Sequence, residues 1–188
     1  MSVWVLRTSS VANVVFGVLI AASAGVRLDA ADAASATAAP WLGIIGAVFG
    51  IFGLSGLYLT HGDRLGAWGP AAFVPAMTGL ALSVAQFYGL TFALPGAGPL
   101  GPLFPLGYGP FLFGFLLLDV VLLASRALPR EAVLCLIAGA VLNAVGFATP
   151  EVRLFGVVIF GAGIAWLGSV QVAGLARSPR NSTDMHLS

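Results

Sequence analysis

Lysine is absent from this sequence, which also has a single cysteine and two histidines among its 188 residues. The lone Cys135 excludes a disulfide within the chain, and with it any metal site or redox pair built from cysteines of one chain. The net charge is only +1, and the eight arginines do not form the basic stripe that a nucleic-acid backbone requires. We therefore expect no nucleic acid among its partners.

Charged residues of either sign are also scarce. They make up 8% of the chain, whereas soluble domains carry about 25%. Hydrophobic residues make up 59%, and the mean hydropathy is +1.02. A soluble fold must cover most of its surface with polar groups, which this composition does not supply. The sequence therefore predicts an integral membrane protein whose partner is the lipid bilayer.

Six apolar runs have the length that a helix needs to cross a bilayer core, roughly 20 residues. The stretch 111–123 is apolar in both strand registers until Asp119, which is not the alternation of a barrel strand. The predicted fold class is all-α, a polytopic transmembrane helix bundle that forms one domain over residues 1–176, followed by a disordered cytoplasmic tail over 177–188. The expected spans are 10–26, 41–60, 70–94, 106–125, 132–148 and 152–176.

The arginines are distributed unevenly between the two ends of these spans. Six lie at one end, and only Arg27 and Arg153 lie at the other, each with acidic residues nearby in sequence. Because cytoplasmic loops are enriched in arginine, both termini are predicted to be cytoplasmic. The aromatic residues expected at the membrane interfaces, near the span ends, are Trp4, Trp41, Tyr58, Trp68 and Tyr108.

The first apolar run has a second interpretation. Arg7, the apolar stretch 11–22 and the small residues Ala22-Ser23-Ala24 together resemble a signal peptide with its cleavage site. Cleavage would leave five spans and an N-terminus outside the cell. We favour a retained first span and keep cleavage as the alternative.

Two loops at the arginine-poor end differ in composition. Residues 27–40 are mostly alanine and are expected to form a solvated linker. Residues 95–110 contain five prolines, five glycines and no charge, so an extended apolar segment is expected there. This segment is interpreted either as a lid over an outward-opening cavity or, as we favour, as a connector that rests on lipid.

Asp119 is the only acidic residue well inside an expected span. A charge at the bilayer centre costs at least ~2.5 to 3.5 kcal/mol, so an acid there indicates either a function or a polar partner. The residues expected at similar depth are Ser55, Thr78, Ser169 and Gln171, which with Asp119 form the candidate intramembrane polar site. The site is interpreted either as a proton or cation site or as a protonated carboxyl that bonds to a neighbouring helix or reaches the inner interface.

The remaining polar and small residues predict helix packing. Asn13, Gln86 and Asn143 are expected to form interhelical hydrogen bonds. Glycines such as Gly46 and Gly50 form a strip on the second span, against which another helix of this chain or of a second copy can pack closely.

A catalytic site is not apparent in the sequence. The segment Gly53-Leu54-Ser55-Gly56 resembles the serine motif of rhomboid proteases, but that chemistry needs a histidine base in a neighbouring span. The two histidines, His61 and His186, lie beside a loop and in the tail. No residue pattern predicts a metal site, a haem or a phosphate-binding loop, so we expect no catalytic residue, no cofactor and no metal.

Three short segments stand out beside the spans: Gly56-Leu57-Tyr58, Arg64-Leu65-Gly66 and Ala127-Leu128-Pro129-Arg130. They resemble segments of a family of small bacterial six-helix integral membrane proteins with no assigned activity. The resemblance implies a multi-pass bundle in the bacterial cytoplasmic membrane and brings no ligand or catalytic residue with it.

Two functional hypotheses follow from the sequence. The leading one is a non-enzymatic accessory or scaffold bundle, which acts as a homo-oligomer, with another membrane subunit or alone. The alternative is a proton- or cation-coupled transporter of a small solute that uses Asp119. An intramembrane enzyme ranks last.

Overall fold

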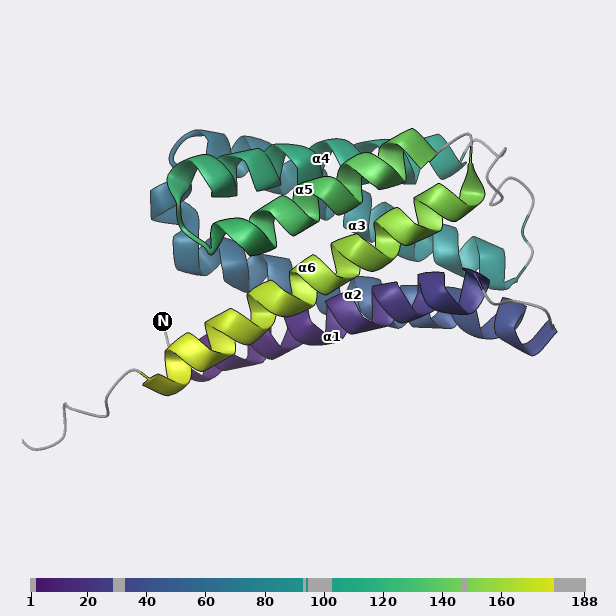
Figure 1. Cartoon of the computed structure of the whole chain (residues 1–188), viewed down its shortest axis with the longest axis horizontal. Helices are drawn as coiled ribbons and strands as arrows, with labels where there is room; N and C mark the ends of the chain where they lie inside the picture. Colours follow the sequence, from purple (N-terminus) through teal and green to yellow (C-terminus); the bar gives the residue numbers. More distant parts are fainter. Residues whose placement is uncertain (1–2, 29–32, 93, 95–102, 147–148, 178–188) are drawn as a thin grey trace, which may run out of the picture.

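The computed structural model describes residues 3–28, 33–92, 94, 103–146 and 149–177, which form six helices and no strand. The all-α class predicted from the sequence is therefore confirmed for this part of the chain. The helices are α1 (Val3–Leu28), α2 (Ala33–Leu65), α3 (Trp68–Thr91), α4 (Leu103–Ser125), α5 (Arg130–Val145) and α6 (Pro150–Arg177) (Figure 1).

The six helices form a closed ring. Each helix packs against the next one along the chain, and α6 packs back against α1. The helices alternate in direction, so α6 ends at the same end of the ring at which α1 begins (Figure 1). We call this the terminal end, and we call the opposite end, where α1 ends and α6 begins, the far end.

Five of the helices, all except α5, are long and apolar enough to cross a membrane. Many large apolar side chains face outward from the ring: Trp4, Val18, Phe52, Leu59, Trp68 and Phe113 are each more than half exposed. Polar side chains such as Asn13, Asp119 and Asn143 are instead buried. An apolar exterior around buried polar groups is the arrangement of a membrane-embedded bundle.

The expected linker over residues 27–40 is wrong for most of its length, because α1 continues to Leu28 and α2 begins at Ala33. Alanine has the highest helix propensity of all residues, so an alanine-rich segment that packs on a neighbour continues the helix. Here the Ser23 hydroxyl of α1 donates a hydrogen bond to the Ala39 carbonyl oxygen at 2.7 Å. Residues 29–32 lie outside the described residues.

The extended segment expected over 95–110 is likewise wrong for its second half, because α4 begins at Leu103. Pro105 falls in the first turn of this helix, where its missing amide hydrogen leaves no helical hydrogen bond unmade. Residues 95–102 lie outside the described residues, as does the predicted tail from residue 178 onward.

Glycines allow the ring to close. A Cβ atom on Gly17 of α1 would collide with the carbonyl oxygen of Gly161 of α6, and a Cβ atom on Gly161 would collide with that of Gly17. The backbones of α1 and α6 are therefore in direct contact. The predicted glycine strip on α2 also packs within this chain, since a Cβ atom on Gly53 would collide with the side chain of Asn13.

Candidate functional site

A cavity of about 430 Å³ lies inside the ring near the far end. Ligand pockets in proteins range over about 300–1,000 Å³, so this volume suits a small molecule. All six helices contribute to its wall. The apolar part of the wall includes Ile20, Leu80, Phe87, Phe111, Val157 and Phe160, and the polar, uncharged part includes Ser23, Ser83, Gln86, Tyr108 and Asn143.

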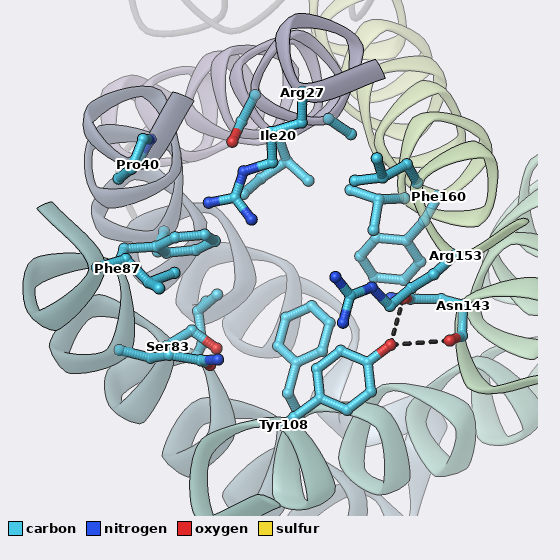
Figure 2. A pocket seen from close by; sticks show the side chains of 18 residues that line it. Ile20, Arg27, Pro40, Ser83, Phe87, Tyr108, Asn143, Arg153 and Phe160 are labelled. Atoms are coloured by element: carbon cyan, nitrogen blue, oxygen red, sulfur yellow. Dashed lines mark hydrogen bonds between the residues drawn. The ribbon is translucent and has the colours of Figure 1, made fainter. Parts of the chain in front are cut away.

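Two arginines line this cavity from opposite ends of the sequence. Arg27 comes from the last turn of α1 and Arg153 from the first turn of α6. Figure 2 shows both guanidinium groups pointing into the cavity. None of the described residues that line the cavity is acidic, so the charged side chains of its described wall are both cationic.

Neighbouring groups help to position the two guanidinium groups. The guanidinium carbon of Arg27 is 5.8 Å from the centre of the Phe87 ring, a distance at which a cation is attracted to an aromatic face. Arg153 lies in the first turn of α6, which also contains Glu151, near the positive end of the helix dipole. The arrangement therefore favours a ligand with negative charge.

Tyr108 and Asn143 close the wall between α4 and α5. The Tyr108 hydroxyl donates a hydrogen bond to the backbone oxygen of Asn143 at 2.9 Å and also contacts the side-chain oxygen of Asn143 (Figure 2). Tyr108 was expected at the membrane interface, but it turns into the ring, because the buried amide of Asn143 offers its hydroxyl a partner there. The indole rings of Trp4, Trp41 and Trp68 are exposed on the outer surface.

Asp119 does not line this cavity. Its side chain is 0% exposed, and neither carboxyl oxygen has a hydrogen-bond partner among the described residues. It borders a separate void of about 20 Å³, whose wall also includes Asn13, Phe16 and Phe115. This void is large enough for one water molecule.

The structure does not gather the expected polar layer around Asp119, because the other four candidates do not line its void. Thr78 and Ser169 are exposed, and their hydroxyls donate to carbonyl oxygens one turn earlier in their own helices. Ser55 bonds in the same way to the carbonyl oxygen of Ile51. A hydroxyl satisfied within its own helix needs no partner from a neighbouring helix. Gln171 does not line the void but contacts Asn13, which does: its side-chain oxygen is 3.5 Å from the Asn13 amide nitrogen.

Sequence reasoning missed Arg27 and Arg153 as site residues and treated them only as the minority in the arginine distribution. That distribution nevertheless held the signal, since these are the two arginines at the arginine-poor end of the spans. Both of these arginines line the cavity, so the two exceptions to the distribution lie at one place in the structure.

The cavity thus combines two fixed positive charges, hydrogen-bonding side chains and apolar walls. The described residues include no group of three or more histidine, cysteine, aspartate or glutamate side chains that could hold a metal ion. Comparison of the chain with protein-family models, with curated proteins and with solved structures finds no match.

Proposed function

We propose that this chain is a non-enzymatic, six-span protein of the bacterial cytoplasmic membrane that binds an amphiphilic organic anion in the far-end cavity. One observation carries this proposal: Arg27 and Arg153 direct two guanidinium groups into a single cavity lined by all six helices.

The chemistry of the cavity defines the class of ligand. A guanidinium group presents a planar fork of donors that matches a carboxylate or a phosphate, and such charge-assisted bonds are about twice as strong as neutral ones. The apolar wall, which includes Phe87, Phe111 and Phe160, suits an aliphatic or aromatic body. The volume of about 430 Å³ is in the lower half of the usual range for pockets, which favours one anionic group on a compact apolar body.

The proposal of six spans depends on α5. This helix has 16 residues and is about 24 Å long at ~1.5 Å per residue, shorter than the bilayer core of about 30 Å. It nevertheless connects α4 to α6, which run in the same direction, so the chain has to return across the membrane between them. Local thinning of the bilayer accommodates a short span at modest cost, and a long arginine side chain at the start of α5, that of Arg130, can extend toward the interface.

The arginine distribution supports cytoplasmic termini. With that orientation, the far end and its cavity face the outside of the cell. Arg27 and Arg153 are then exceptions to the distribution because they serve the ligand.

A pure scaffold or accessory role would not require charges in a cavity, so ligand binding is the better-supported function. All six helices of one chain contribute to the wall of the cavity, so the binding proposal does not require a second copy or another subunit. A second candidate is proton-coupled transport of the bound anion. It is favoured by the position of Asp119, because the void that Asp119 borders is also lined by Phe115, whose ring contacts that of Phe160 in the cavity wall.

A ligand series with matched chains tests the binding proposal. The purified protein in mild detergent is heated with an alkyl phosphate, an alkyl carboxylate, an alkyl alcohol or an alkyl ammonium of equal chain length. A ligand at 100 times its dissociation constant stabilises a folded protein by about 2.7 kcal/mol, which raises the melting temperature by several degrees. We expect this shift with the two anions alone. Equal shifts with the alcohol or the ammonium, or no shift with either anion, would overturn the proposal.

A further inference from the structure

Three hollows follow one another along the helices α1, α2 and α6. On α1, residues 20–27 line the far-end cavity, Asn13 and Phe16 line the void beside Asp119, and residues 6–10 line a pocket of about 180 Å³ at the terminal end. The same succession holds on α6, where the cavity, the void and the terminal pocket are lined within 153–160, 164–167 and 171–175. Residues 6 to 27 span about 32 Å of helix at ~1.5 Å per residue, close to the thickness of a bilayer core.

Polar side chains connect the void to the terminal pocket. Asn13 lines the void, and its amide nitrogen lies 3.2 Å from the carbonyl oxygen of Gly53 and 3.5 Å from the side-chain oxygen of Gln171. Gln171 in turn lines the terminal pocket together with Ser9 and His61. A line of hydrogen-bonding groups thus leads from the terminal end of the ring to the space beside Asp119.

Aromatic rings separate the same void from the far-end cavity. Phe111 and Phe160 line the cavity, whereas Phe115 lines the void. The centre of the Phe115 ring is 4.7 Å from that of Phe111 and 5.1 Å from that of Phe160, and the centres of Phe111 and Phe160 are 5.7 Å apart. Rings at these distances are in direct contact, so the three described side chains that meet between the void and the cavity are apolar.

We propose that Asp119 is a proton-binding site that is reached from the terminal end through Gln171 and Asn13 and is closed toward the far-end cavity by Phe111, Phe115 and Phe160. This site is additional to the anion site and does not depend on it.

The surroundings of Asp119 favour a proton over a metal cation. Hard cations take six or more oxygen ligands, whereas the polar groups at the void are the Asp119 carboxyl and the Asn13 amide. A proton forms a covalent bond with the carboxyl, needs no further ligand and removes the cost of a charge in an apolar interior. The described residues that line the void come from α1, α2, α4, α5 and α6, and none besides Asp119 is titratable or charged. Among the described residues that line the terminal pocket, the titratable one is His61.

Dicyclohexylcarbodiimide tests the site, because this apolar reagent adds to protonated carboxyl groups in membrane interiors. The purified full-length protein is treated at a series of pH values, and the adduct is located by mass spectrometry of peptides. We expect one adduct at Asp119 that forms more slowly as the pH rises and that is absent from Asp119→Asn. The matched control Asp63→Asn removes an exposed acid and should leave labelling unchanged.

The wild-type protein alone can decide the outcome if Asp119→Asn does not fold. Absence of an adduct at Asp119 at low pH would overturn the proposal. Protection by sodium chloride but not by choline chloride would also overturn it, because the site would then hold a metal cation.

Proteoliposomes with a different pH on each side test the route. A tag on the N-terminus reports which way the protein is inserted. Labelling of Asp119 is expected to follow the pH on the terminal side, and Asn13→Leu is expected to slow this response several-fold. Labelling that follows the pH on the far side would contradict the proposed route.

Discussion

The guanidinium carbon of Arg27 lies 5.8 Å from the centre of the Phe87 ring, so a charge from α1 rests beside an aromatic face from α3. The side chain of Arg153 reaches the same cavity from α6 (Figure 2). Three helices therefore determine where the positive charge of the cavity lies. A ligand bound there would link the first, third and last helices of the ring, and for that reason its binding should stabilise the whole bundle.

The first prediction concerns the two arginines. Arg27→Gln and Arg153→Gln should each weaken binding of an alkyl phosphate about ten- to a hundredfold, because a hydrogen bond to a charged group contributes about 1.5–3 kcal/mol. Isothermal titration calorimetry in detergent measures the change. Arg64→Gln is the matched control, since Arg64 is exposed at the terminal end of α2. An equal loss of affinity in Arg64→Gln would place the anion outside the cavity.

Phe87 should contribute less to the affinity for the ligand than Arg27, the arginine that it contacts. Phe87→Leu keeps an apolar wall but removes the aromatic face, whose attraction for a cation is about 0.5–2 kcal/mol. We expect affinity for the alkyl phosphate to fall about two- to thirtyfold. The same substitution at Phe92, which is exposed just after α3, should leave affinity unchanged. Unchanged binding in Phe87→Leu would show that Arg27 is positioned without this ring.

The Tyr108 hydroxyl contacts the side-chain oxygen of Asn143 as well as its backbone oxygen, and Asn143→Ala removes only the side-chain contact. That side-chain contact predicts a measurable coupling between α4 and α5. Tyr108→Phe, Asn143→Ala and the double variant form a cycle from which the interaction energy is obtained. Interhelical hydrogen bonds in membrane proteins average ~0.6 kcal/mol and reach ~1.7, and we expect a coupling in this range. Unfolding in detergent mixtures supplies the free energies. Tyr88→Phe, in an exposed tyrosine of α3, should show no coupling to Asn143.

Closure of the ring should depend on Gly17. Gly17→Ala places a Cβ atom against the backbone of α6, so α1 and α6 have to separate and the melting temperature should fall by several degrees. Gly25→Ala makes the same change in the same helix at a position with no heavy atom within 4 Å. It should leave the melting temperature unchanged or raise it slightly. Equal effects of the two substitutions would mean that helix propensity, and not the contact with α6, governs the result.

Much of the fold follows from the sequence, because apolar runs of about 20 residues that lack the alternation of barrel strands have to be helices in a bilayer. Each expected span overlaps one of the six helices. The ends of the helices were harder to predict. Alanine in 33–39 is compatible with a linker or a helix, and the choice is made by contacts such as that between Ser23 and Ala39.

The candidate site was less predictable, because it depends on which faces of the helices meet. Asp119 was identified from its position inside a span, but the hydroxyls of Thr78 and Ser169 turned out to bond within their own helices on the outer face. Arg27 and Arg153 are 126 positions apart, and only the closure of α6 onto α1 brings them to one cavity. No local sequence pattern predicts that these two arginines line the same cavity.

The orientation and the number of spans can be tested with single cysteines. Cys135→Ser removes the lone native thiol, and Asp63→Cys or Thr149→Cys then places one near the α2–α3 turn or between α5 and α6. In intact cells a membrane-impermeant maleimide should label Thr149→Cys, whereas Asp63→Cys should react only after the cells are opened. The reverse pattern would place the cavity and both arginines on the cytoplasmic side, so the ligand would come from inside the cell. Labelling of both from one side would mean that α5 does not cross the bilayer, and the ring would then have to lie differently in the membrane.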